Sequence, residues 1–300
     1  MKPIIIDVDT GTDDALAILY AVRHPDLDVR GISCVIGNVS VDQAVINTCK
    51  VLDAASAADI PVAAGAAQPL IERARREGGG SHGPDGLAGI QLPEALRHPS
   101  PMPAVELLHQ LIMASPDPVS LVSLAPKTNL ALLLTSYPNI ATRLEQIIFM
   151  GGSASKAVAE FNVWQDPEAA KLVLESSVPI TMYGLDLFDR LAVERADVDR
   201  LRTHDHPAIR LAGELLHRRH IRYRDSDQKK LRLLGDGGAM VLLTNPELFV
   251  IEERNITVEL EGVGRGHTIV DSGPTITVAV YLDVTKAASA FVKTIYAYAA

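Results

Sequence analysis

Four aspartates within eight residues, Asp7, Asp9, Asp13 and Asp14, are the part of the sequence best suited to chemistry. Carboxylates this close repel one another, and a fold that gathers them is most simply stabilised by a cation. Oxygen ligands favour Ca²⁺ or Mg²⁺ over zinc, and no His or Cys stands at ligand spacing nearby. We therefore expect a divalent cation here, the alternative being that Asp13 or Asp14 caps a helix.

The segments that must position these aspartates alternate between short apolar runs and helix-period stretches. Strands are expected at 3–8, 28–36, 60–64, 118–124, 146–150 and 178–183. Helices are expected at 13–24, 41–57, 103–115, 127–136 and 166–176. This alternation is typical of βαβ units and predicts an α/β fold. We expect one domain over 1–300, with a single open, mostly parallel sheet of Rossmann-like type flanked by helices.

Two segments depart from this alternation. Residues 65–102 are rich in Gly and Pro and lack periodicity, which is typical of a long functional loop or a mobile segment. After residue 255, alternating strands and a final apolar helix predict an antiparallel extension of the sheet near the C-terminus. The segment 206–234 reads as helical.

Polar groups follow several of the expected strands. In open α/β sheets ligands bind beyond the carboxyl ends of the strands. Asn38 follows the second strand, LAPKTN the fourth, MGGS the fifth and Asp186 the sixth. These groups are therefore expected at one rim together with the aspartates.

The composition excludes some classes of partner. The chain has 28 Lys and Arg against 37 Asp and Glu, a formal net charge of −9. We expect no nucleic-acid polymer and no membrane as partner. Cys34 and Cys49 lack CxxC spacing and are expected to be reduced and buried. The apolar run before Asp7 is too short for a signal peptide, so a cytoplasmic location is expected.

The segment DVDTGTDDALAILYA resembles the amino-terminal signature of the nucleoside hydrolases, the inosine–uridine-preferring family. The likeness continues in the family's order through GNVS, HGPDG, LVSLAPKTNLAL, MGGS, VAEFNVWQDPEAA and GDGGAMVLL. The resemblance implies hydrolysis of the N-glycosidic bond of small-molecule ribonucleosides to a free nucleobase and ribose. It also implies a homodimer or homotetramer.

The resemblance further implies a set of site residues. Ca²⁺ would be bound by Asp9, Asp14, the backbone carbonyl of Leu124 and Asp236, and Asp9 would also act as general base toward water. The groups expected to bind substrate are Asp13, Asn38, His82, Met150, Glu160 and Asn162. The last two are spaced two apart, which would place them on one face of an extended stretch.

Two features depart from the best-studied branch of the family. That branch has a His immediately before the last metal-binding Asp, as the acid that protonates the leaving base, whereas this chain has Gly235. Possible replacements are His82, His217, His220 and Tyr223. The Asn that contacts the 5′-hydroxyl also lacks a counterpart, for which Ser153, Ser155 and Lys156 are candidates.

The basic run 218–232 leaves a further possibility open. Its simplest interpretation is a solvated helix face paired with Asp225 and Asp227. A sharper one is that Arg222 or Arg224 meets a 5′-phosphate on a nucleotide substrate.

Two other functions remain to be weighed. IIIDVDTGT and LLGDG resemble motifs of haloacid-dehalogenase-type phosphatases, in which Asp7 would be the nucleophile and Asp9 the acid, with Mg²⁺. That family does not require the Asp13–Asp14 pair or VAEFN. The other candidate is a non-catalytic, Ca²⁺-dependent riboside binder, against which the retention of Asp9 argues. The preference for purine or pyrimidine bases stays open.

Overall fold

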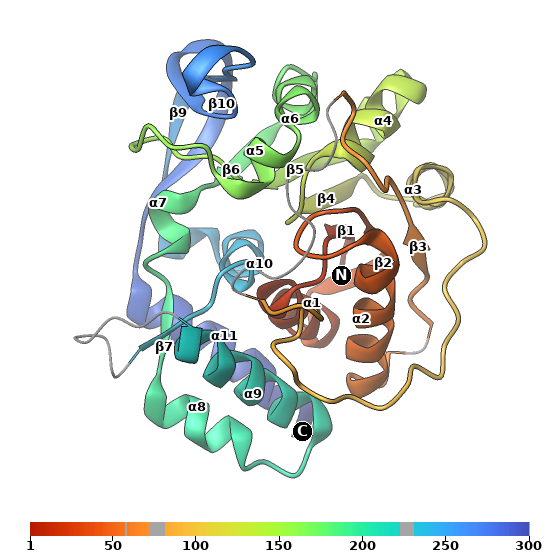
Figure 1. The fold of residues 1–300 in the computed structure, drawn as a ribbon, viewed down its shortest axis with the longest axis vertical. Helices are drawn as coiled ribbons and strands as arrows, with labels where there is room; N and C mark the ends of the chain where they lie inside the picture. Colours follow the sequence, from red (N-terminus) through yellow and green to blue (C-terminus); the bar gives the residue numbers. More distant parts are fainter. Residues whose placement is uncertain (58, 72–81, 223–230, 300) are drawn as a thin grey trace.

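An eight-stranded sheet forms the centre of the computed structural model, which describes residues 1–57, 59–71, 82–222 and 231–299 (Figure 1). The strand order is β3-β2-β1-β4-β5-β6-β10-β9, and every neighbouring pair is parallel except β10 and β9. The strands are β1 (Lys2–Val8), β2 (Leu27–Cys34), β3 (Val62–Ala64), β4 (Val119–Ser123), β5 (Leu144–Met150), β6 (Ile180–Tyr183), β9 (Phe249–Val258) and β10 (Thr268–Leu282). The expected mostly parallel α/β sheet with its antiparallel extension is confirmed.

Helices cover both faces of this sheet. One hydrophobic cluster includes residues of α1 (Thr12–Arg23), α2 (Val41–Ala54), α8 (Arg195–Arg202), α9 (Pro207–Arg222), α10 (Gly237–Thr244) and α11 (Val284–Tyr296). A second cluster includes residues of α3 (Ala104–Ala114), α4 (Thr128–Ser136) and α6 (Pro167–Leu174). Two shorter helices, α5 (Phe161–Gln165) and α7 (Leu185–Phe188), follow β5 and β6.

Strand β1 shows why its sequence is a nearly continuous apolar run. Ile4, Ile6 and Val8 pack into the first cluster, whereas Ile5 packs into the second. Alternate side chains of a strand point to opposite faces, and helices bury both faces of a parallel sheet. The strand therefore needs apolar residues on both sides, until Asp7 introduces a charge.

Of two segments singled out in the sequence, one differs from its prediction and the other agrees with it. The segment 206–234 is not one helix, because α9 ends at Arg222 and β8 (Leu231–Leu233) pairs antiparallel with β7 (Ala192–Glu194). The segment 65–102 has the irregular structure that its composition predicts, with neither helix nor strand in its described parts.

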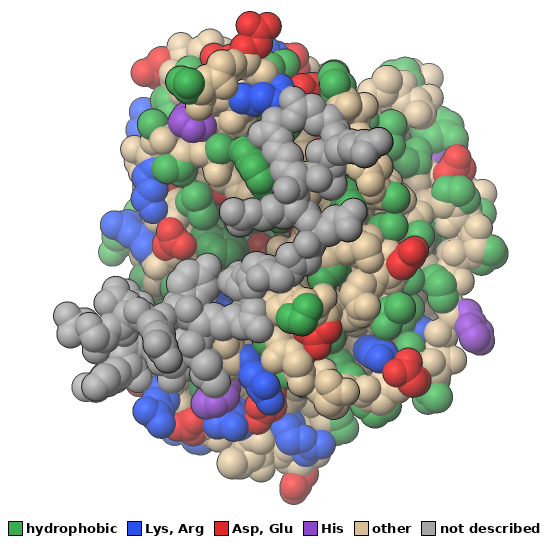
Figure 2. Space-filling model, viewed as in Figure 1, with side chains coloured by type: hydrophobic (Ala, Val, Ile, Leu, Met, Phe, Trp, Pro, Cys, Tyr) green, Lys and Arg blue, Asp and Glu red, His purple; other side chains and the backbone are tan. Residues whose placement is uncertain are grey.

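The surface agrees with the charge balance. Acidic and basic side chains are interspersed among the described residues on the face shown in Figure 2. No helix within the described ranges is long and apolar enough to cross a membrane.

A buried polar network joins β1 to its neighbours through Asp7. The Oδ1 atom of Asp7 accepts hydrogen bonds from Ser33 Oγ of β2 (2.5 Å) and from Asn129 Nδ2 of α4 (2.8 Å). Asn129 also donates to the Cys34 carbonyl (3.0 Å). Burial raises the pKa of Asp7 to about 6, and these hydrogen bonds offset only part of that effect. One oxygen of Asp7 is therefore committed to hydrogen bonds that join β1 to β2 and α4.

Replacing Asp7 with Asn should flatten the pH dependence of stability. The pKa of Asp7 is higher in the folded protein than its ordinary 3.8. The protonated carboxyl therefore stabilises the fold fully below about pH 4, and this stabilisation is lost as the pH rises through about 6. As the pH rises from acidic to neutral, the wild-type protein should lose up to roughly 3 kcal/mol of unfolding free energy that Asp7→Asn does not lose. Urea unfolding at several pH values, with chelator present, measures this. Parallel curves would show that Asp7 is not the titrating group.

Candidate active site

The candidate site lies where the sheet reverses its winding order. From β1 the chain builds outward through β2 and β3 on one side, and through β4, β5 and β6 on the other. Asp9 follows β1 and Leu124 follows β4, and these two strands are hydrogen-bonded neighbours. Such a switch point leaves a crevice at the carboxyl ends of the strands. The topology therefore places both residues beside that crevice.

Three buried carboxylates gather at this point. Asp13, Asp14 and Asp236 each offer an oxygen atom, and these atoms lie within 4.8 Å of one another. Asp13 and Asp14 belong to the first turn of α1, and Asp236 directly precedes α10. Asp14 Oδ2 accepts the Gly11 N–H (2.8 Å), whereas its buried Oδ1 has no hydrogen-bond partner in the described part of the chain. Residues more than 200 positions apart in sequence thus form one acidic cluster.

Asp9 joins this cluster through Asn38. The Asn38 backbone N–H donates to Asp9 Oδ2 (2.6 Å), and its Nδ2 reaches both Asp9 Oδ1 (3.2 Å) and Asp14 Oδ2 (3.3 Å). A Cβ at Gly37 would lie 1.9 Å from Asp9 Oδ2, so only glycine allows this close approach. Asn38, expected as a substrate-binding residue, here holds two carboxylates in place.

The electrostatics of the cluster are those of a cation site. Burial raises the pKa of Asp9 and of Asp236, and neighbouring aspartates raise both further. Burial and the adjacent Asp13 raise the pKa of Asp14 to about 7. A hard divalent cation accepts carboxylate and carbonyl oxygens and would remove this repulsion. The unpartnered Oδ1 of Asp14 and the all-oxygen donor set fit such an ion.

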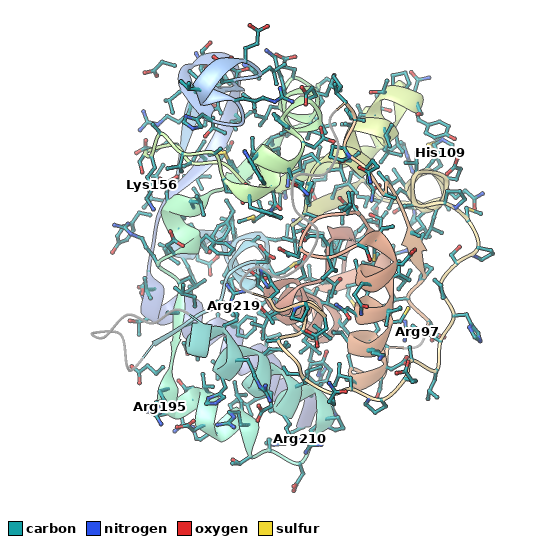
Figure 3. The ribbon with its side chains drawn as sticks, viewed as in Figure 1. Arg97, His109, Lys156, Arg195, Arg210 and Arg219 are labelled. Carbon is teal, nitrogen blue, oxygen red and sulfur yellow. The ribbon has the colours of Figure 1, made fainter. Side chains whose placement is uncertain are left out.

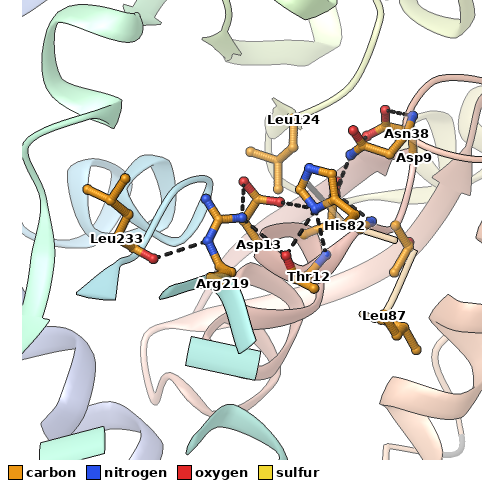
Figure 4. Close-up of polar contacts among 12 residues, drawn as sticks. Asp9, Thr12, Asp13, Asn38, His82, Leu87, Leu124, Arg219 and Leu233 are labelled. Carbon is orange, nitrogen blue, oxygen red and sulfur yellow. Dashed lines mark hydrogen bonds and ion pairs between the residues drawn. The ribbon is translucent and has the colours of Figure 1, made fainter. Parts of the chain in front are cut away.

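Arg219 is a site residue that was not predicted from the sequence. Its Nη1 lies 2.8 Å from Asp13 Oδ2 and 3.2 Å from Thr12 Oγ1, and its Nε donates to the Leu233 carbonyl (3.2 Å) (Figure 4). Figure 3 shows Arg219 in the middle of the molecule, whereas Arg195 and Arg210 lie at its edge. Burial alone would raise the pKa of Asp13, but the charges of Arg219 and His82 lower it.

The sequence does contain a pattern from which the buried position of Arg219 could have been predicted. Ala212, Leu215 and Leu216 are buried on α9, and Arg219 falls on the same helical stripe. An arginine at a core position needs a buried partner, so its position on the apolar stripe indicates an internal ion pair. The sharper expectation for the basic run concerned Arg222 and Arg224; Arg224 and the side chain of Arg222 lie outside the described part.

A side chain at position 235 would overlap atoms of the neighbouring side chains. Gly235 has a φ of +65°, and a Cβ built on it would lie 2.5 Å from Asp13 Oδ2 and 2.9 Å from Arg219 Nη2. The side chains of Asp13 and Arg219 therefore occupy the space into which a side chain at position 235 would project. This explains physically why the site has no room for a His at that position.

His82 reaches the site from the irregular segment 65–102. Its Nδ1 accepts the Thr12 N–H (3.1 Å), contacts Thr12 Oγ1 (3.0 Å) and lies 3.5 Å from Asp13 Oδ1. His217 is half-buried on α9. The side chain of His220 and all of Tyr223 lie outside the described residues. Of the four candidate acids, His82 is the one that these contacts place beside the carboxylates.

Glu160 and Asn162 differ in local structure from the expectation. Glu160 is the N-cap of α5 and Asn162 lies within that helix, so the extended stretch predicted for them is wrong. Glu160 Oε2 accepts the N–H groups of Gly152, Asn162 and Val163, because the first turn of a helix leaves its donors free. A five-residue helix is too short to show its period in the sequence.

Asn162 nonetheless faces the switch point. Its Nδ2 donates to the Leu124 carbonyl (2.7 Å) and lies 3.4 Å from the Met150 carbonyl. One side-chain amide thus connects Leu124, which follows β4, with Met150, which ends β5.

The three candidates for a 5′-hydroxyl contact are engaged with α7 and the residue after it. Ser153 and Ser155 donate to Asp186 Oδ1, and Lys156 pairs with Asp189 (3.4 Å). These contacts order the segment after β5.

Comparison with known proteins identifies the family. A family model described as inosine-uridine preferring nucleoside hydrolase matches residues 4–289. This chain belongs to that family. It is therefore an enzyme of the N-glycosyl hydrolase class, and neither the phosphatase nor the non-catalytic binder is supported. The commitment of Asp7 to Ser33 and Asn129 agrees, because a phosphatase nucleophile would need to face the substrate.

Individual relatives cover almost the whole chain. The pyrimidine-specific ribonucleoside hydrolase RihA of Salmonella arizonae is 38% identical over 276 residues, or 90% of this chain and 88% of that protein. The purine-preferring ribonucleoside hydrolase of Gardnerella vaginalis is 27% identical with a TM-score of 0.91, covering 99% of both chains. The plant nucleoside hydrolase PpNRh1 is 28% identical with a TM-score of 0.90, covering 98% of both chains.

Removing the charge of Arg219 should destabilise the protein through Asp13. Arg219→Met leaves a buried carboxylate unpaired, at a cost of about 3–5 kcal/mol in unfolding free energy. Adding Asp13→Asn should recover part of that loss, because the unpaired charge is gone. Chemical denaturation of both single variants and the double variant measures the coupling.

The matched control is Arg210→Met on the same helix, where the exposed arginine donates to the His204 and Asp205 carbonyls. It should shift stability by no more than about 0.5 kcal/mol. Strictly additive losses for Arg219 and Asp13 would contradict the buried pair.

Proposed function

We propose that this ribonucleoside hydrolase acts on pyrimidine ribonucleosides and uses Ca²⁺ held by Asp9, Asp14, the Leu124 carbonyl and Asp236. The observation that carries the proposal is the buried Asp14 Oδ1, which has no hydrogen-bond partner among the described residues and lies in a cluster of carboxylates. Asp13 is the less suitable ligand, because Arg219 already balances its charge. When bound, Ca²⁺ would lower the pKa of the attacking water and orient the ribose hydroxyl groups.

Asp9 is suited to the role of general base. Both of its oxygens are held by Asn38, so the carboxylate has a fixed direction. A carboxylate held in one direction can accept a proton from a water bound beside it. Asp9 would take a proton from water as the oxygen attacks the anomeric carbon and the bond to the base breaks.

The same carboxylates favour the transition state. Cleavage of a glycosidic bond develops positive charge on the sugar ring. Fixed negative groups around the ribose stabilise that charge without reorganising. In this proposal the carboxylates of Asp13 and Glu160 and the amide of Asn162 bind its hydroxyl groups.

His82 is proposed as the acid that protonates the departing base. Its Nδ1 lies 3.1 Å from the Thr12 backbone nitrogen and 3.5 Å from Asp13 Oδ1, so Thr12 orients the ring and the carboxylate favours its protonated form. The protonated ring would donate its Nε2 proton to the departing base, in a site where position 235 is glycine.

The base preference rests on the relatives. Sequences named pyrimidine-specific share 37–38% identity with this chain, whereas the purine-preferring structure shares 27%.

A cytoplasmic location and a homodimeric or homotetrameric assembly stay predictions, as does purine or pyrimidine salvage as the biological role.

A substrate panel tests the proposed function. Purified protein with Ca²⁺ is incubated with uridine, cytidine, inosine, adenosine and uridine 5′-phosphate, and free base is read by chromatography. Uracil release faster than hypoxanthine release supports the proposal. Release of base from the nucleotide alone would instead favour the 5′-phosphate interpretation.

Asp9→Asn should lower kcat by about 10²–10⁴-fold, because the amide keeps the size of the side chain but cannot accept the proton. Asn47→Ala is a matched control: this buried residue bonds the Thr10 and Asp85 carbonyls and lies outside the proposed machinery. It should retain turnover within a few-fold at a temperature where it is folded. Full turnover by Asp9→Asn would remove Asp9 from the mechanism.

His82→Gln should slow hydrolysis of uridine far more than hydrolysis of a p-nitrophenyl riboside. The nitrophenolate leaves without protonation, whereas a pyrimidine needs a proton or an equivalent donor. Comparing kcat/KM for both substrates separates leaving-group assistance from a general loss of the site. Equal losses on both substrates would assign His82 to binding alone.

A further inference from the structure

Lys127 is a fully buried lysine that the proposed reaction does not use. Its side chain has 0% exposure, and its Nζ donates to the carbonyls of Met150 (2.7 Å), Ser123 (3.4 Å) and Ala125. It also lies 4.5 Å from the centre of the Phe149 ring. An ammonium group has three protons, and here three carbonyls receive them.

The carbonyls that Lys127 holds flank the proposed cation ligand. Ser123, Leu124 and Ala125 are consecutive at the end of β4, and the two outer carbonyls accept from Lys127. The middle carbonyl instead accepts from Asn162 Nδ2 (2.7 Å). The two outer carbonyls therefore face Lys127, whereas the Leu124 carbonyl faces a different donor, Asn162.

The arrangement is costly enough to need a reason. Burial of an ammonium is unfavourable even when hydrogen-bonded, and an apolar side chain of similar volume would fill the space. Burial lowers the pKa of Lys127 to about 8, while Glu160 and Asp7 act in the opposite direction. The group thus remains largely protonated at neutral pH and keeps its three donors.

We infer that Lys127 is a positioning residue: by holding the carbonyls of Ser123 and Ala125, it aims the Leu124 carbonyl at the cation site. The inference rests on the proposed function, in which Leu124 is a Ca²⁺ ligand. Two effects of the ammonium oppose each other. Its charge repels a cation, whereas its hydrogen bonds orient a ligand. The contacts with both flanking carbonyls favour orientation as the dominant effect.

Lys127→Met, an unbranched side chain of similar length, removes the charge and the donors together, so the direction of its effect on Ca²⁺ affinity shows which of the two dominates. Chelator-treated full-length protein is titrated with Ca²⁺ by calorimetry, and its fold is checked by circular dichroism and thermal melting. The variant should bind Ca²⁺ at least tenfold more weakly, and its turnover of uridine should be recovered by excess Ca²⁺. A merely structural lysine would lower the melting temperature without changing Ca²⁺ affinity.

The control is Lys171→Met, which removes a partly exposed lysine paired at 3.8 Å with Glu175 and should leave Ca²⁺ affinity unchanged. If Lys127→Met does not fold, Lys127→Gln retains two N–H donors without the charge and should bind Ca²⁺ within a few-fold of wild type. Unchanged or tighter binding by Lys127→Met, or at least tenfold weaker binding by Lys127→Gln, overturns the inference while leaving the proposed function intact. A wild-type protein that binds no Ca²⁺ contradicts the calcium part of the proposed function, and the inference with it.

Discussion

Repulsion among buried carboxylates is the constraint on which the rest of the site depends. Asp9, Asp13, Asp14 and Asp236 are each at most 3% exposed, so water cannot screen them. The fold brings them together because β1 ends beside β4 and because α1 and α10 begin at the same place. The neighbouring groups either balance the charge of a carboxylate or fix its orientation. Arg219 balances Asp13, and Asn38 holds Asp9 and Asp14.

The local exceptions in the backbone follow from the same constraint. Gly37 lets the chain approach Asp9 closely, and Gly235 leaves the volume that the Arg219 guanidinium fills. In the family branch with a His at position 235, that volume would belong to the acid. Here the side chains of Asp13 and of Arg219 from α9 occupy it, and His82 approaches from the loop before α3. The carboxylate side of the pocket keeps the family motif.

Local patterns made much of this predictable. Apart from α5, the strands and α-helices of the first 183 residues were expected within a few residues, because apolar runs and helical periods are properties of neighbouring positions. The Asp7–Asp14 cluster was visible for the same reason. Arg219 and Lys127 were not predicted, since their roles depend on partners from other elements. Glu160 was misplaced because a short helix begun by a side-chain cap has almost no periodicity.

The central claim is that the carboxylate cluster holds one Ca²⁺ on which hydrolysis depends. The most direct test is a Ca²⁺ titration of metal-stripped protein in which bound ion and uridine turnover are recorded on the same samples. We expect one ion per chain at saturation, with turnover rising in proportion to occupancy from a negligible value. Full turnover by protein that contains no divalent metal would contradict it.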